Sequence, residues 1–219
     1  MLQRIKTIHT TAEAEIIEKK SRFIGHAFPV TSEEAALEHL AAVRKAHAKA
    51  GHNCFAWQIG DDDRFTRQSD DGEPSGTAGM PILDYLRKEG IKNTLVVVTR
   101  YFGGTLLGTG GLVRAYGRAA KEAVTAARII EKVLHQKLSI ICPYHLSGKL
   151  QYEILQKGHM LHDTLYTDMV EFIVFAEDSA ADGFVKYMRD ITADVVEIAL
   201  LARTYCAEID GVMTSLEEE

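Results

Sequence analysis

A continuous run of apolar and β-branched residues, TLVVVTRYF at 94–102, is the feature that most restricts how this chain can fold. A run without polar alternation is typical of a strand that is buried on both faces. The glycine-rich sequence GGTLLGTGG follows at 103–111, and an alanine-rich stretch with helical character comes after it. Small residues let a helix approach a sheet closely. The segment therefore predicts a central strand joined by a tight glycine loop to a helix that packs on the sheet.

The residues before this strand predict a hairpin and a helix. Two strand-like runs lie within 10–30 and are separated by the polar sequence EKKS at 18–21, which is typical of a hairpin. Thr31 and Glu34 have the spacing of a capping box at the start of an amphipathic helix.

The segment between this helix and the central strand predicts a strand, a loop and a short helix. HNCFAWQIG at 52–60 is strand-like, and the Asp-, Ser- and Gly-rich residues 61–80 predict a loop. Pro81 suits the first position of a helix that ends at Gly90.

The order of elements changes in the last third of the chain. The pattern predicts β-α-β-β-α-β, the ferredoxin-like arrangement, with strand 136–143, helix 146–157, strand 161–166, strand 169–176, helix 180–191 and strand 195–208. We therefore expect an α+β protein made of two α/β-sandwich domains, at 1–134 and 135–219.

The charge is divided unevenly between these two parts. The 219 residues carry a net charge of -6, which argues against loose, non-specific binding to nucleic acid. Residues 1–134 sum to +3 and residues 135–219 to -9, so we expect two modules that face different partners.

The sequence predicts a cytoplasmic protein without a metal or a cofactor. No apolar run approaches the roughly 20 residues of a membrane-spanning helix, and the first residues lack the apolar core of a secretory signal. Cys54, Cys142 and Cys206 are widely spaced and predict buried thiols in a reducing compartment. The histidines show neither H-E-x-x-H nor paired Cys/His spacing, so no zinc site is expected.

An acidic loop within 67–79 is the first candidate site. Its carboxylates could hold Mg²⁺ or act as acid and base, but loop carboxylates also cap turns and helices. Its Ser and Gly content also fits a loop that is ordered by a bound partner. The candidate binding residues here are Arg67, Ser69, Asp70, Asp71, Glu73, Ser75 and Thr77.

The glycine loop is the second candidate. A helix N-terminus offers unsatisfied N–H groups and a dipole that favours an anion, and glycine lets a phosphate approach the backbone. The stretch matches neither G-x-x-x-x-G-K-[ST] nor G-x-G-x-x-G, so nucleotide hydrolysis is the weaker interpretation. The candidate residues are Gly103, Gly104, Gly110 and Gly111.

Basic residues continue along the predicted helix. Arg114, Arg118, Lys121 and Arg128 are spaced along one face, which could follow successive phosphates or could be an ordinary solvated face. Tyr101, Phe102 and Tyr116 would add stacking surfaces if they are exposed.

Arg100 differs from these basic residues, because it continues a buried strand. A buried guanidinium needs a partner, so we expect it to pair with a carboxylate of the 70–73 loop. No catalytic constellation emerges from the residue spacing, and the sequence contains no G-x-S-x-G nucleophile elbow.

Three segments make the chain resemble a known family. KKSRFIGHAFPV, RQSDDGEPSGTAGMPIL and VVVTRYFGGTLLGTGGLVRAYG are similar to the YigZ/IMPACT family of small cytoplasmic proteins. The resemblance implies a first domain with the fold of the second domain of a small-subunit ribosomal protein, a fold that is also found in small-molecule kinases. It implies a second domain similar to the last domain of elongation factor G. The additional N-terminal domain of the eukaryotic members has no counterpart here.

The eukaryotic IMPACT proteins regulate translation initiation by competing for an activator of a stress kinase, so the resemblance implies a link to translation or RNA. Our first hypothesis is a non-enzymatic module that binds RNA, the ribosome or a translation-related protein. The alternatives are an enzyme that acts on a phosphorylated small molecule, and a purely protein–protein regulator.

Overall fold

The computed structural model describes residues 1–60 and 65–216. The chain forms two compact units. The N-terminal unit is Ile5–Ile130, and the C-terminal unit is Met1–Arg4 together with the residues from Glu131 onward. Strands β1 (Arg4–Ile8) and β7 (Ile129–Cys142) both run through this division. The boundary expected between residues 134 and 135 also falls within β7.

The N-terminal unit is built on a five-stranded antiparallel sheet in the order β2-β3-β6-β4-β5. The strands are β2 (Ala12–Glu18), β3 (Ser21–Pro29), β4 (His52–Ile59), β5 (Phe65–Ser69) and β6 (Thr94–Tyr101). The prediction of a central strand is confirmed, because β6 lies in the middle and is buried from Thr94 to Arg100. The prediction of a hairpin is confirmed by β2 and β3.

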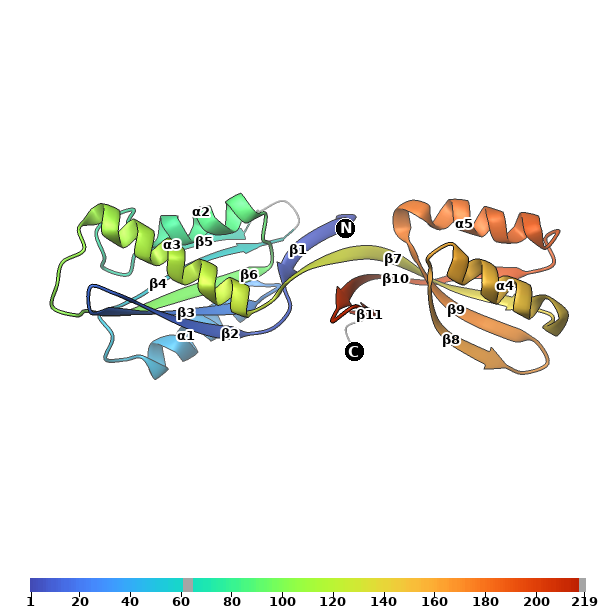
Figure 1. Cartoon of the computed structure of the whole chain (residues 1–219), viewed down its shortest axis with the longest axis horizontal. Helices are drawn as coiled ribbons and strands as arrows, with labels where there is room; N and C mark the ends of the chain where they lie inside the picture. The colour runs from blue at the N-terminus through green and yellow to red at the C-terminus, as the bar shows by residue number, and fades with distance from the viewer. Residues whose placement is uncertain (61–64, 217–219) are drawn as a thin grey trace. The chain divides into compact units, whose positions relative to one another are not determined.

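Helices cover both faces of this sheet. Helices α2 (Gly79–Glu89) and α3 (Thr109–Ala126) lie on one face, and α1 (Glu33–Ala46) lies on the other (Figure 1). Consecutive residues of β6 therefore enter different cores: Val96 and Val98 pack with α2 and α3, and Leu95 and Val97 pack with α1. Burial on both faces explains why this strand shows no polar alternation.

Helix α3 approaches the sheet closely, as its alanine content predicts. A Cβ atom on Gly25 of β3 would lie 2.6 Å from the carbonyl oxygen of Ala119 and 2.9 Å from the Cβ atom of Ala123. The glycine of the strand and the alanines of the helix together permit this contact.

Three local predictions were wrong. The N-cap of α1 is Ser32, not Thr31, because the Ser32 hydroxyl accepts the N–H of Ala35 at 3.2 Å. The predicted loop at 61–80 contains the edge strand β5, which pairs with β4 although its polar sequence FTRQS shows no strand pattern. Residues 61–64 of that loop lie outside the described residues. Helix α2 begins at Gly79, so Pro81 is not its first residue.

The C-terminal unit has the predicted ferredoxin-like order. Its elements are β7, α4 (Tyr144–Gln156), β8 (Met160–Tyr166), β9 (Val170–Glu177), α5 (Asp178–Ile191), β10 (Glu197–Ile209) and β11 (Val212–Ser215). The strands lie in the order β11-β10-β7-β9-β8, and both helices pack on one face of this sheet (Figure 1). The α+β class with two sandwich domains is confirmed. No helix in the described part of the chain is long and apolar enough to cross a membrane.

Candidate functional site

The acidic loop and the glycine loop of the N-terminal unit meet in one cleft of about 410 Å³. A cleft of this size is in the range that small-molecule sites occupy. It is lined by His52, Glu73, Pro74, Arg100, Phe102, Leu106, Leu107, Gly108, Thr109 and Leu112. Two segments that lie far apart in the sequence, each singled out from its composition, therefore face each other across the same cavity.

A buried ion pair joins the two sides of this cleft. Nη1 of Arg100 donates to Oε1 of Glu73 at 2.6 Å, and the hydroxyl of Tyr116 donates to the same oxygen at 2.7 Å. The side chains of Arg100 and Glu73 are 7% and 3% exposed. The prediction that Arg100 pairs with a carboxylate of the 70–73 loop is confirmed. Charge-assisted hydrogen bonds offset the cost of removing both charges from water.

Asp70 caps the start of α2. Its carboxylate accepts the backbone N–H groups of Gly76 at 2.8 Å, Ala78 at 3.0 Å and Gly79 at 2.8 Å. Burial would raise the pKa of Asp70, but these three N–H donors outweigh burial and hold that pKa below its usual value. Of the alternatives left open for this carboxylate, the geometry matches a helix cap.

Asp71 holds the loop against β4 and α1. Its carboxylate accepts the backbone N–H of Asn53 at 2.7 Å and a guanidinium N–H of Arg44 at 2.9 Å. Neighbouring polar groups close the turn: the Ser69 hydroxyl accepts the N–H of Asp71, and the Thr77 hydroxyl donates to the carbonyl of Pro74. The carboxylates of this loop therefore form interactions that keep the loop ordered.

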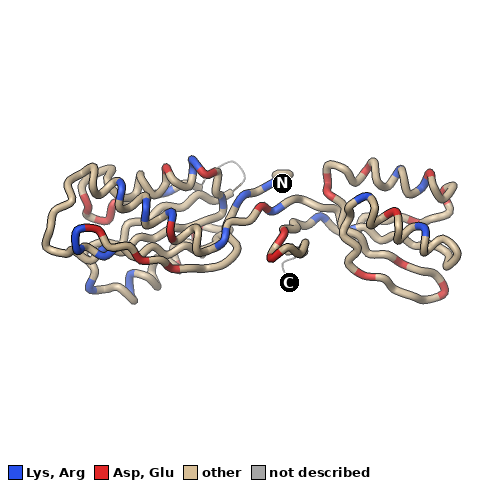
Figure 2. Tube along the Cα trace, in the orientation of Figure 1, with Lys and Arg blue, Asp and Glu red and all other residues tan. Residues whose placement is uncertain are grey.

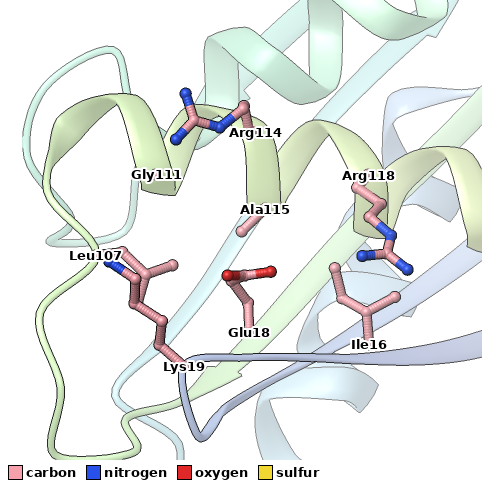
Figure 3. A pocket seen from close by; sticks show the side chains of 8 residues that line it. All are labelled: Ile16, Glu18, Lys19, Leu107, Gly111, Arg114, Ala115 and Arg118. Carbon is pink, nitrogen blue, oxygen red and sulfur yellow. The ribbon is translucent and has the colours of Figure 1, made fainter.

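A second pocket of about 240 Å³ adjoins the cleft, and Leu107 lines both. It lies between the β2–β3 hairpin and helix α3. Figure 3 shows Arg114 and Arg118 extending from α3, and Glu18 and Lys19 extending from the hairpin opposite them. The remaining lining residues are Ile16, Gly111 and Ala115.

The cations of this second pocket differ from three arginines elsewhere in the unit. Arg22, Arg44 and Arg100 each form an ion pair with a carboxylate. Within residues 1–60 and 65–216, no ion-pair partner lies within 4.0 Å of Lys19, Arg114 or Arg118. Exposed cations without a partner are available to an anion from solution.

Helix α3 begins next to these cations. Its N-cap, Gly108, has φ 73° and no capping side chain, and its first turn contains no acidic residue. A Cβ atom on Gly110 would meet nothing closer than the guanidinium of Arg114 at 3.6 Å. The first N–H groups of α3 are thus approachable, and the helix dipole favours a negative group there.

The remaining predicted site residues differ in their positions. Tyr116 is fully buried and offers no stacking surface, whereas Phe102 is exposed. The Tyr101 hydroxyl contacts Nδ1 of His47 at 3.0 Å. The Arg67 guanidinium lies over Trp57. Ser75 and Lys121 are exposed and line neither pocket.

The glycines of the loop do not share one role. Gly103 packs so tightly on the backbone of Lys20 and Ser21 that a Cβ atom would collide there, and its N–H donates to the Ser21 hydroxyl at 3.1 Å. Gly104 has φ 81° and open space around it. The basic stripe is shorter than predicted, because α3 ends at Ala126 and Arg128 lies outside the helix with φ 61°.

Sequence reasoning missed several lining residues. His52 enters the cleft because β4 is hydrogen-bonded to β6, with His52 opposite Arg100. Lys19 lies in the turn between β2 and β3. The polar EKKS turn was the available signal for Lys19, but nothing local placed that turn beside α3.

The two units differ in their balance of acidic and basic residues. Figure 2 shows both signs distributed over the N-terminal unit, with basic residues at the turn of the β2–β3 hairpin, and mainly acidic residues over the C-terminal unit.

Comparison with known proteins places the chain in a family. Residues 19–124 match the Impact N-terminal domain, and residues 140–194 match a domain described as Domain of unknown function (DUF1949). The IMPACT family member YvyE of Bacillus subtilis is 39% identical over 192 residues, which is 88% of each chain. The chain belongs to the IMPACT family.

More distant IMPACT relatives share part of the chain. Protein IMPACT of Rattus norvegicus is 36% identical over 100 residues, which is 43% of this chain and 31% of that protein. A solved crystal structure of a hypothetical protein is similar at a TM-score of 0.59 and 30% identity, and the match covers 92% of this chain and 99% of that one. Every residue that lines the cleft lies within the segment that matches the Impact N-terminal domain.

Proposed function

We propose that this IMPACT family member is a non-enzymatic, translation-linked regulator whose N-terminal unit binds RNA, free or within the ribosome. The resemblance to eukaryotic regulators of translation initiation supports the link to translation. The proposed RNA contact is the surface formed by Lys19, Arg114, Arg118 and the start of α3.

The observation that carries this proposal is the pocket between α3 and the hairpin. Three cations and one carboxylate line it: Lys19, Arg114, Arg118 and Glu18, together with Gly111 of the first helical turn. Basic side chains beside free backbone N–H groups are the combination that binds phosphate. Exposed Phe102, which lines the neighbouring cleft, offers a face on which a base can stack.

The test is a filter-binding titration of the full chain with single-stranded RNA and with ribosomes. Arg114→Glu combined with Arg118→Glu is expected to abolish most of the affinity. The matched control is Lys45→Glu combined with Lys49→Glu, which makes the same charge change on the α1 side of the unit. Equal affinity of the first variant and the wild type would reject the proposal.

Salt dependence provides a second measurement. Loss of two phosphate contacts to single-stranded RNA is expected to flatten the slope of log K against log salt by about 1.4, because each contact contributes about 0.7. The control variant is expected to keep the wild-type slope. A salt-independent affinity would show that phosphate contacts do not drive the binding.

A protein partner is the second candidate. Leu106 and Phe102 are 82% and 59% exposed at the edge of the cleft, and large exposed apolar side chains are typical of protein interfaces. A pull-down with Leu106→Asp as the comparison, carried out with and without nuclease, separates the two candidates. Capture that survives nuclease and is lost in Leu106→Asp would favour the protein partner.

An enzyme that acts on a phosphorylated small molecule has less support. Asp70 and Asp71 are engaged in hydrogen bonds that order the loop, and Glu73 is paired with Arg100. The carboxylates considered for acid–base chemistry are thus already engaged. A thermal-shift screen of nucleotides and phosphometabolites tests this alternative, since a ligand at 100 times its Kd stabilises by about 2.7 kcal/mol.

A further inference from the structure

A cluster of three metal-ligating side chains lies on the α1 side of the N-terminal sheet, apart from the cleft. Glu13 of β2, His26 of β3 and His47 at the end of α1 each offer one ligand atom, and these atoms lie within 4.8 Å of one another. Glu13 and His26 face each other across the hairpin in register, with 3.1 Å between Oε2 and Nδ1.

The hydrogen bonds around His26 leave the lone pair of its Nδ1 atom without a hydrogen-bond donor. The Thr99 hydroxyl donates its proton to Oδ1 of Asn53 at 2.7 Å, so its oxygen can only accept from Nε2 of His26, 3.4 Å away. A proton on Nε2 leaves the lone pair of Nδ1 facing the Glu13 carboxylate. In the other neutral tautomer, Nε2 faces the hydroxyl oxygen with no proton between them. A cation between His26 and Glu13 interacts favourably with both the Nδ1 lone pair and the carboxylate, while Nε2 keeps its proton for the Thr99 hydroxyl.

Burial disfavours a proton as that cation. A charged imidazolium loses its hydration when the ring is buried. The side chain of His26 is 7% exposed. A neutral imidazole with its lone pair directed at a carboxylate is the form that coordinates a metal ion.

His47 is held in a suitable orientation by a second contact. Its Nδ1 lies 3.0 Å from the Tyr101 hydroxyl, which leaves Nε2 as the nitrogen available to a metal. A hydrogen bond to the other ring nitrogen is the usual way in which proteins orient a histidine ligand. Thr99 does the same for His26.

We propose that Glu13, His26 and His47 form a binding site for a zinc-type divalent ion. Two imidazoles and one carboxylate suit Zn²⁺, with the fourth position left to water. Tetrahedral ligands at zinc lie roughly 3.4 Å apart, close to the separation of Nδ1 and Oε2. Glu13 is exposed and His47 is half-buried, so changes in their side-chain torsions bring the third ligand into place.

The experiment is calorimetric titration of the whole chain with Zn²⁺, with Co²⁺ absorption as a report on four-coordinate geometry. Wild type is expected to bind one Zn²⁺, and Glu13→Gln and His47→Ala are each expected to weaken binding at least ~10-fold. His39→Ala is the control, since it removes another half-buried imidazole of α1. The three cysteines are buried and do not compete for the ion in the folded protein.

Thermal unfolding without metal shows whether each variant is folded, and added Zn²⁺ is expected to raise the Tm of the wild type more than that of either variant. Absence of saturable Zn²⁺ binding in the wild type would overturn the proposal. Affinity equal to the wild type in Glu13→Gln or in His47→Ala would overturn it as well, and so would a loss of affinity in His39→Ala as large as in those variants.

Discussion

Arg100 and Glu73 form an ion pair with 2.6 Å between Nη1 and Oε1, and both side chains are almost fully buried. The pair ties the acidic loop to the end of β6 at the cleft. Tyr116 of α3 donates to the same carboxylate, so three elements meet at one oxygen. The stability of the unit and the shape of its cleft therefore depend on the same contact.

Glu73→Gln is expected to destabilise the chain by ~3–5 kcal/mol, because it leaves the Arg100 guanidinium buried without a counter-charge. Urea unfolding followed by circular dichroism measures this change. Glu15→Gln is the matched control: it breaks the exposed pair between Glu15 and Arg22 and is expected to cost less than ~1 kcal/mol. Similar losses in the two variants would contradict the importance assigned to the buried pair.

Gly25→Ala is expected to destabilise the N-terminal unit by ~1–3 kcal/mol, because the added Cβ atom would meet the backbone of Ala119. Gly117→Ala, within α3, has 3.9 Å to its nearest neighbour and is expected to stabilise by up to ~1 kcal/mol through helix propensity. Thermal unfolding of both variants measures whether Gly25→Ala loses stability and Gly117→Ala gains it. A stable Gly25→Ala would show that α3 can move away from the sheet.

Asp70→Asn is expected to cost ~0.5–2 kcal/mol at neutral pH, through loss of a charged cap on α2. The pKa of Asp70 is lowered on folding, so its contribution is complete above the unfolded value of about 3.9. That contribution is lost as the pH falls through the lower folded pKa. The difference in unfolding free energy between the wild type and Asp70→Asn should therefore shrink on acidification. A difference that stays constant down to the acid transition would refute this account.

The thiol of Cys54 is expected to resist alkylation in the native protein. Burial raises its pKa to about 12, so almost no thiolate is present at neutral pH. Cys142 is buried as well, and burial raises its pKa too. Iodoacetamide labelling followed by mass spectrometry should show slow modification of the folded chain and rapid modification in denaturant. Fast native labelling of Cys54 would mean that β4 opens locally.

Local patterns determined most of the secondary structure. The apolar run that begins at Thr94 predicted a strand covered on both faces, since a strand exposed on one face alternates in polarity. The periodicity of the last third of the chain was sufficient for the ferredoxin-like order, because each of its elements carries its own apolar pattern. Desolvation predicted that Arg100 pairs with a carboxylate of the 70–73 loop, and the structure identifies that carboxylate as Glu73.

Tertiary structure decided what strand pairing and packing bring together. The strand Phe65–Ser69 has no apolar signature and exists because β4 offers it an edge. Lys19 joins Arg114 and Arg118 only because the hairpin packs beside α3, and the roles of Asp70 and Asp71 depend on which N–H groups the loop presents to them. Glu13, His26 and His47 have no motif spacing, and the register of the hairpin and the end of α1 make them neighbours. The spacing of residues along the chain indicates local conformation. A site depends on distances between side chains, and these distances are set only when the chain folds.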